Sequence, residues 1–332
     1  MKLSIITTVY QAEKDLPRLL DSMMAVKSQD VEFFLIDNGS TDGSNAICRE
    51  YAERDSRFVI HRLEDNIGYI RARNLGLDIV EADYIGFCDS DDYIDSTNYD
   101  IIMDKINDSN CDFLIAGWYT VIGENVRKND SFATDGIYDT KKIQKMIPQF
   151  FGPSKGKKSV AGFMWKEFIR KSILDNLKIR FETDIKPYED MLFNASLIPH
   201  IATLQIVNIP IYYYIVNPKS ITADLISNFN LRERYDLQKR YFSKMSAVSV
   251  NDTCMEHLFN NALNSFLSIA SKAGKKYGIL RGSRELKAVF SKEDVSKQIV
   301  NSRPWEITQK IGKFLLKNRM YYFLLFLRKI RG

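Results

Sequence analysis

Short apolar runs alternate with amphipathic stretches through the first hundred residues of the chain. Runs rich in β-branched and aromatic residues predict strands, and apolar residues spaced three or four apart predict helices. The predicted strands are Leu3 to Val9, Val31 to Ile36, Phe58 to His61 and Tyr84 to Cys88, and the predicted helices are about Glu13 to Ala25, Ser44 to Arg54 and Tyr69 to Ile79. This alternation predicts an α/β fold, Rossmann-like, with a mostly parallel mixed sheet and flanking helices.

The pattern changes in the second half of the chain. Phe113 to Tyr119 and the aromatic run Ile209 to Val216 predict further strands, whereas the chain from about Asn230 onward is chiefly helical. The clearest helical stretches are Arg232 to Met245 and Thr253 to Lys272. We therefore expect an α/β domain over residues 1–225 and a helical C-terminal module over residues 226–332.

Length and composition agree with a mid-sized domain plus a module. The chain has 332 residues, of which 45% are apolar and 27% charged, and this balance excludes long disordered or fibrous segments. Its four cysteines show no CxxC spacing, so we expect reduced core thiols and neither a zinc site nor a disulfide framework. The first residues show no secretory signal, which predicts a cytoplasmic location.

Charge is distributed unevenly along the chain. Residues 1–100 carry 10 Lys and Arg against 20 Asp and Glu, a net of −10, whereas residues 301–332 carry 8 against 1, a net of +7. The tail from about Trp305 to Arg331 predicts a basic amphipathic helix that lies on an anionic membrane, so that the protein is peripheral on the inner face of the cell membrane. Its apolar stretch Met320 to Leu327 is too short to cross a bilayer. Packing on the domain or on a second subunit, as in a homo-oligomer, is the alternative, and no nucleic-acid-binding motif accompanies the basic residues.

An acidic tetrad, Asp89-Ser90-Asp91-Asp92, follows the predicted strand Tyr84 to Cys88. Ligands of open α/β sheets bind beyond the carboxyl ends of the strands. Carboxylates at such a place suit a divalent cation held against a diphosphate. Alone, however, a D-x-D triplet is more typical of a turn or a helix cap.

Six segments, in order, resemble the family-2 inverting glycosyltransferases with the GT-A fold, and the resemblance spans about residues 3–222. They are Ser4 to Tyr10, Ile36 to Asp42, Asn66 to Gly68 with Ala72 to Asn74, Asp89 to Asp92, Tyr188 to Asp190, and Ser220 to Thr222. The resemblance implies transfer of a sugar from a nucleotide-sugar, a UDP-sugar by preference, to a hydroxyl of a glycan or lipid-linked acceptor in bacterial surface-polysaccharide assembly. It also implies a nucleotide-sugar half over about residues 1–115 and an acceptor half over about residues 116–225.

The resemblance also implies roles for residues on the donor side. Thr8 and Tyr10 are expected at the nucleotide base, where the tyrosine ring stacks. Asp37 and Asn38 are expected to bind the base as well, although the family more often has a second aspartate where this chain has Asn38. Arg73 is expected at the base or the diphosphate.

The remaining roles concern the metal and the acceptor. Asp91 is the expected ligand of Mn²⁺ or Mg²⁺, with Asp89 in support near the ribose or a metal-bound water. Asp190 is the expected base that accepts the proton of the acceptor hydroxyl, and Asp92 and Glu189 are expected on the acceptor side. Two alternatives stay open: a sugar nucleotidylyltransferase, and a non-catalytic, membrane-associated module that binds nucleotide-sugars.

Overall fold

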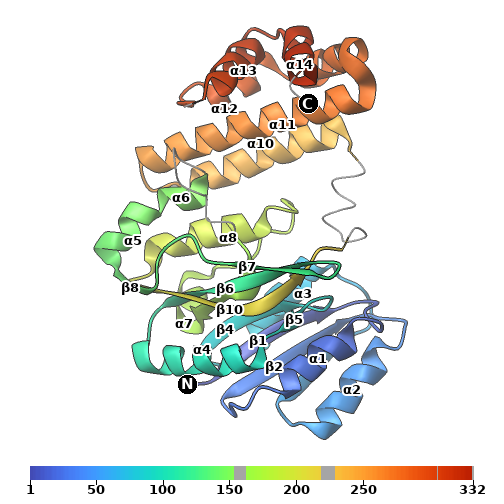
Figure 1. Ribbon diagram of the computed structural model, residues 1–332, viewed down its shortest axis with the longest axis vertical. Helices are drawn as coiled ribbons and strands as arrows, with labels where there is room; N and C mark the ends of the chain where they lie inside the picture. Colours follow the sequence, from blue (N-terminus) through green and yellow to red (C-terminus); the bar gives the residue numbers. More distant parts are fainter. Residues whose placement is uncertain (153–161, 218–228, 305, 331–332) are drawn as a thin grey trace. The chain divides into compact units, whose positions relative to one another are not determined.

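The computed structural model describes residues 1–152, 162–217, 229–304 and 306–330 (Figure 1). Two compact units make up the chain. Unit 1 comprises Met1–Lys145, Gly162–Asp184 and Ser196–Asn217, and unit 2 comprises Met146–Ala161, Ile185–Ala195 and Pro218–Gly332. The basic loop Lys155 to Lys158, the segment Ser220 to Thr222 and the expected boundary near residue 225 lie outside the described residues.

Unit 1 contains a mixed sheet in which the strands lie in the order β3-β2-β1-β4-β9-β6-β10-β5, with β7 beside β6 and β8 beside β10. The first four strands of this order are parallel, and β9 runs antiparallel to both β4 and β6. The strands are β1 Leu3–Val9, β2 Val31–Asn38, β3 Phe58–Leu63, β4 Tyr84–Asp89, β5 Tyr93–Ile94, β6 Phe113–Ile122, β7 Asn125–Asn129, β8 Gly136–Asp139, β9 Glu167–Arg170 and β10 Thr203–Ile215.

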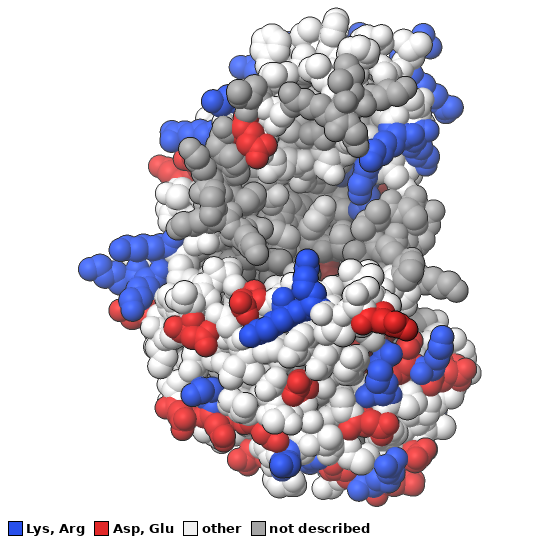
Figure 2. Space-filling model, viewed as in Figure 1, with Lys and Arg blue, Asp and Glu red and all other residues white. Residues whose placement is uncertain are grey.

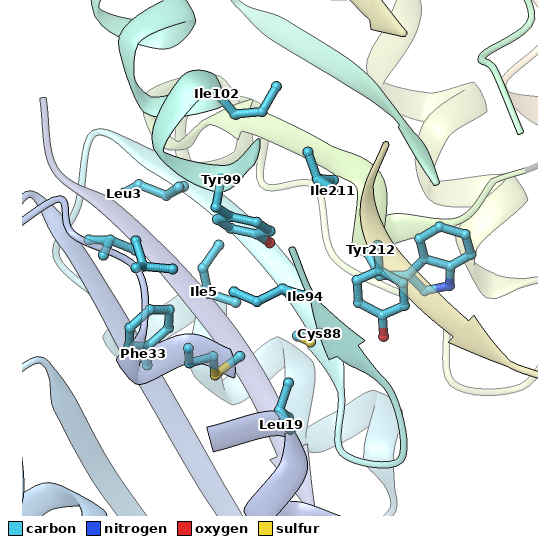
Figure 3. Packing of buried hydrophobic residues seen from close by; sticks show 14 of the residues in the cluster. Leu3, Ile5, Leu19, Phe33, Cys88, Ile94, Tyr99, Ile102, Ile211 and Tyr212 are labelled. Carbon is cyan, nitrogen blue, oxygen red and sulfur yellow. The ribbon is translucent and has the colours of Figure 1, made fainter. Parts of the chain in front are cut away.

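Helices cover both faces of the parallel strands because alternate side chains of each strand point to opposite faces. Leu3, Ile5 and Phe33 join a core with helices α1 (Leu16–Met24), α2 (Ser44–Arg54) and α4 (Ser96–Ser109), as Figure 3 shows in part. On the other face, Gly76 of α3 (Tyr69–Ile79) lies so close to the sheet that an added Cβ would be 2.8 Å from Ile6 Cγ2. The glycine thus lets α3 pack tightly on β1 and β2.

The predicted elements agree with this sheet in type and order, and β1, α2 and α3 agree in their bounds. The strand predicted from Ile209 begins earlier, at Thr203. Strands β5, β7, β8 and β9 are short or lie at the surface, and the apolar pattern did not predict them. Among the helices, α1 begins at Leu16, one residue before Pro17, and not at Glu13.

Unit 2 is largely helical. Its main core joins α10 and α11 to the helices that follow them, through side chains such as Phe266, Phe290 and Leu324. The remaining helical segments of the chain are α5 Thr140–Met146, α6 Pro148–Phe151, α7 Lys171–Leu177, α8 Glu189–Leu197, α10 Leu231–Ala247, α11 Asp252–Val289, α12 Lys292–Ile299, α13 Ile307–Lys317 and α14 Tyr321–Ile330, with short 3₁₀ turns at Met164–Lys166 and Ile198–His200. Within α11, Gly278 has a non-helical backbone (φ +75°).

The prediction of a single C-terminal helix is wrong, because α13 and α14 are separate helices. Arg319 adopts φ +55° between them. The amide of Arg319 donates to Leu316 O (3.1 Å) and that of Met320 to Leu315 O (2.8 Å), the two bonds of a Schellman motif. Glycine normally marks this turn, and its absence here explains why the break was not predicted.

Two further expectations concern cysteine and membrane crossing. All four cysteines are free and buried, as expected from their spacing. Within the described ranges, none of the helices combines the length and apolar character that a bilayer crossing requires.

Candidate active site

The carboxyl ends of β1, β2 and β4 carry Thr8, Tyr10, Asp37, Asn38 and the acidic tetrad. The strand register pairs Thr8 with Ile36 on one side and with Asp89 on the other, so the loops after the three strands leave the same edge of the sheet. Thr8 is half-buried in β1, and Tyr10, just beyond the strand, is 48% exposed. An exposed ring at this edge is suited to stack on a planar base.

Side chains of the β1–α1 loop fasten it to the β2–α2 loop. Gln11 Oε1 accepts from the amide of Thr41 (2.8 Å), and Glu13 Oε2 accepts from the amide of Gly43 (2.7 Å). In return, Ser44 Oγ accepts from the amide of Ala12 (2.8 Å). These bonds hold the loop that carries Tyr10 at the end of β2.

Asp37 and Asn38 are buried and support the neighbouring turns. Asp37 Oδ1 accepts from the amide of Ser40 (2.9 Å), and its Oδ2 lies 3.7 Å from Arg62 Nε. Asn38 Nδ2 donates to Asn66 Oδ1 (3.0 Å), while Asn38 Oδ1 accepts from the amide of Ile67 (3.0 Å). The Asn38 amide group therefore ties the end of β2 to the turn before α3, in addition to any contact with a base.

Gly39 explains the close approach of these two turns. It has φ +74°, and an added Cβ would lie 2.6 Å from the backbone carbon of Asp65. Both the left-handed backbone and the lack of space require glycine here.

Arg73 is 6% exposed and forms an ion pair with Asp89, whose Oδ1 lies 2.6 Å from Arg73 Nη2. The rings of Tyr69, Phe87 and Phe181 surround the guanidinium at 5.3 to 5.8 Å from their centroids. Arg73 thus holds Asp89 in place at the end of β4, while Arg71 lies exposed on α3. The Asp89 side chain remains 33% exposed.

The other two carboxyls of the tetrad differ in their surroundings. Burial, followed by the charge of Asp89, raises the pKa of Asp91 to about 6. Asp92 is 1% exposed, and burial followed by the charges of Asp89 and Asp91 raises its pKa to about 8. Asp92 accepts from the amide of Ile215 (2.6 Å) and from the Tyr212 hydroxyl (2.8 Å), which itself accepts from the amide of Asp89 (3.0 Å).

The carboxylates of Asp89 and Asp91 suit a divalent cation only together with ligands from outside the protein. Among the described residues there is no group of three or more His, Cys, Asp or Glu side chains that suits a metal ion. The charge of Asp89 raises the pKa of Asp91, so the two carboxylates repel each other, and a cation relieves such repulsion. Mg²⁺ is commonly held by one or two carboxylates, with phosphate and water oxygens completing its shell, and the donor set fits this arrangement.

Two residues at this edge, Tyr212 and Arg18, were not predicted from the sequence to belong to it. Tyr212 links Asp89 to Asp92 and stacks on Trp165 (4.5 Å between centroids, 11° between planes). Arg18 of α1 donates to the carbonyl of Asp91 (2.6 Å) and lies over the ring of Tyr93. The aromatic run Ile211 to Tyr214 was the only signal for Tyr212, and as expected it packs within a strand.

Glu189 and Asp190 open helix α8 and belong to unit 2. Both lie in the first turn, where the positive end of the helix dipole favours carboxylate charge. Their expected roles stay predictions.

The fold and the motifs together define a glycosyltransferase. The chain belongs to glycosyl transferase family 2, whose family model matches residues 4–177. The enzyme class expected from the six motifs is thereby confirmed.

The chain is similar to the uncharacterized glycosyltransferase EpsJ of Bacillus subtilis, with 26% identity over 73% of this chain and 68% of EpsJ. It is also similar to the teichoic acid poly(glycerol phosphate) polymerase of Staphylococcus epidermidis, with 27% identity over 64% of this chain and 28% of the polymerase. The chain therefore spans only about a quarter of the polymerase's length.

Of solved structures, TarS 1–349 from S. aureus shares the fold. Its TM-score is 0.69 with 19% identity, over 100% of this chain and 92% of that one. The same TarS fragment in complex with UDP-GlcNAc has a TM-score of 0.66. This likeness confirms the GT-A fold and the presence of a helical C-terminal region.

Proposed function

We propose that the chain transfers a sugar from a UDP-sugar to a hydroxyl of a glycan or lipid-linked acceptor, with inversion at the transferred carbon. The observation that carries the proposal is the edge of the sheet at which the exposed ring of Tyr10 and the carboxylates of Asp89 and Asp91 all lie. A flat base, a ribose and a diphosphate are the ligand groups that match these side chains. The TarS complex supports a uridine nucleotide as the donor.

On the donor side, Tyr10 stacks on the base, and Thr8, Asp37 and Asn38 bind or position it. Arg73 acts mainly through Asp89, which it orients toward the ribose or the cation. Asp91, with Asp89 in support, would hold a divalent cation, whose positive charge would stabilise the departing diphosphate.

On the acceptor side, Asp190 accepts the proton of the acceptor hydroxyl while that oxygen attacks the anomeric carbon. The bond between this carbon and the diphosphate oxygen breaks, and the diphosphate leaves with the electron pair. Glu189 orients the acceptor, and Asp92, held by Ile215 and Tyr212, keeps the tetrad loop against β10. A single displacement of this kind inverts the configuration of the sugar.

The test is a screen of UDP-sugars and hydroxyl acceptors with Mn²⁺ or Mg²⁺, in which release of UDP is measured. Asp190→Asn should lower turnover by at least about 10² while donor binding in calorimetry is preserved, because general-base catalysis contributes about 10²–10⁴. Asp91→Asn should instead weaken donor binding in the presence of metal. Asp130→Asn, at an exposed carboxylate of unit 1, is the matched control.

Different failures reject different parts of the proposal. Full turnover in Asp190→Asn rejects the assigned base, and equal donor binding with and without metal rejects the role of Asp91. If no UDP-sugar binds, the uridine donor is wrong.

A further inference from the structure

Helices α13 and α14 use one side of each helix to complete the core of unit 2. Leu315 and Leu316 of α13 and Tyr321, Leu324 and Leu325 of α14 are all buried in the cluster that includes α11. Leu325 also lies against Gly274 and Gly282, where an added Cβ would be 3.0 Å from it. The buried side of α13 and α14 therefore packs on the protein, which is the alternative that the sequence left open.

The other side of the two helices remains exposed. It carries six large apolar side chains, here called the aromatic surface, each between 40% and 59% exposed: Ile311, Phe314, Tyr322, Phe323, Phe326 and Leu327. On α14 the rings lie together, since Tyr322 stacks on Phe326 (6.5 Å, 7°) and meets Phe323 edge-on (5.7 Å). So many exposed apolar side chains on two adjacent helices are typical of a binding surface.

Exposed basic side chains lie beside the aromatic surface on α13. In this helix Lys313 donates to the carbonyls of Val300 and Ser302, and the exposed acidic residue Glu306 is the N-cap. Lys310 and Lys317 are exposed, four residues before and three residues after Phe314, on the same side of α13. Figure 2 shows Lys and Arg side chains beside the white surface of this part of the chain.

These features favour one occupant. In a symmetric pair of chains the same surface of both copies meets, so the lysines beside one aromatic surface approach the basic side chains beside the other, and this repulsion costs free energy. An anionic bilayer instead matches both features, because its acyl boundary takes the aromatic rings and its headgroups attract the lysines. The charge therefore distinguishes a lipid surface from a second copy.

We propose that the aromatic surface of α13 and α14 inserts into the headgroup region of an anionic lipid bilayer. Phe314, Tyr322, Phe323 and Phe326 enter the acyl boundary, and Lys310 and Lys317 bind the lipid phosphates. The contact places the chain on the face of a membrane, where a lipid-linked acceptor resides. It is independent of the transfer reaction, so it is tested by binding alone.

The test is co-sedimentation of the full chain with vesicles of phosphatidylcholine, with or without phosphatidylglycerol. The chain should bind the anionic vesicles and lose binding as salt rises. Phe323→Ser with Phe326→Ser should weaken binding by at least about tenfold, because half-exposed rings lose their burial in lipid. Lys310→Gln with Lys317→Gln should weaken binding by about tenfold or more.

Matched controls lie on the β6–β7 hairpin of unit 1. Ile122→Ser with Val126→Ser removes two apolar side chains of similar exposure (58% and 54%), and Arg127→Gln with Lys128→Gln removes two exposed charges. Both control variants should bind like the wild type. Equal losses in the controls and in the test variants overturn the proposal.

A measurement on the wild type guards against variants that fail to fold. Anionic vesicles should slow hydrogen exchange in peptides that cover α13 and α14, and neutral vesicles should not. Unchanged exchange overturns the proposal. So does a dimer in sedimentation equilibrium that Phe323→Ser with Phe326→Ser dissociates, without any vesicle binding by the wild type.

Discussion

The acidic residues of the tetrad have different surroundings although they are adjacent in sequence. Asp89 is paired with Arg73, Asp91 is half-buried, and Asp92 is buried against β10. Proximity in sequence therefore does not make them equivalent. The bonds of each carboxylate decide whether it is available to a ligand.

At this scale, we predict that Asp92→Ala lowers the free energy of unfolding by about 2 kcal/mol or more, because the amide of Ile215 and the hydroxyl of Tyr212 lose their acceptor. Asp92→Asn should cost at least about 1 kcal/mol less, since the amide keeps an acceptor there and is uncharged, like the Asp92 carboxyl below its raised pKa of about 8. Urea unfolding followed by tryptophan fluorescence, to which Trp118 and Trp165 of unit 1 contribute, measures both. If Asp92→Ala and Asp92→Asn lower the free energy of unfolding equally, the hydrogen bonds of Asp92 do not account for the loss.

The turn between α13 and α14 depends on the backbone and the side chain of Arg319. Arg319 takes a left-handed backbone, which costs a non-glycine residue about 1 kcal/mol. Its Nη2 donates to Lys287 O (2.5 Å) and to Phe290 O (3.3 Å) at the end of α11. These bonds offset the backbone cost and fix the turn against α11.

At the scale of this element, both Arg319→Ala and Arg319→Gly lose the side-chain bonds, but only glycine relieves the backbone. We predict that α13 and α14 open more easily in both variants, and that Arg319→Gly is more stable than Arg319→Ala by about 1 kcal/mol. Hydrogen exchange of peptides from the two helices measures the free energy of local opening. Arg284→Ala, at an exposed arginine of α11, is the control.

At the scale of the whole molecule, buried tyrosines couple stability to alkaline pH. Burial raises the pKa of Tyr84 and of Tyr235 from 10.0 to about 12, and in Tyr213 burial with the charge of Asp95 does the same. The folded chain therefore keeps protons that the unfolded chain releases above pH 10. Stability from these groups is fully present below pH 10 and is lost as the pH rises through 12.

We predict that the free energy of unfolding falls as the pH rises from 10 to 12, and that part of the tyrosinate absorbance appears only near pH 12 in the folded chain. Tyr235→Phe should reduce the slope of stability against pH. Tyr10→Phe, at an exposed ring, should leave the slope unchanged. If Tyr235→Phe leaves the slope of the free energy of unfolding against pH unchanged, buried tyrosines are not its cause.

By itself, the sequence determined the α/β order of the elements and the family, because strand and helix periodicities and six short motifs are local patterns. It also placed the tetrad at the end of a buried strand. The tertiary structure decided how the side chains are used: Arg73 pairs with Asp89, and Tyr212 meets Asp92 from 120 residues away. The tertiary structure also divided the tail into two helices. The bonds of Arg319 to the end of α11 stabilise a turn there, although the sequence has no glycine or proline at that position.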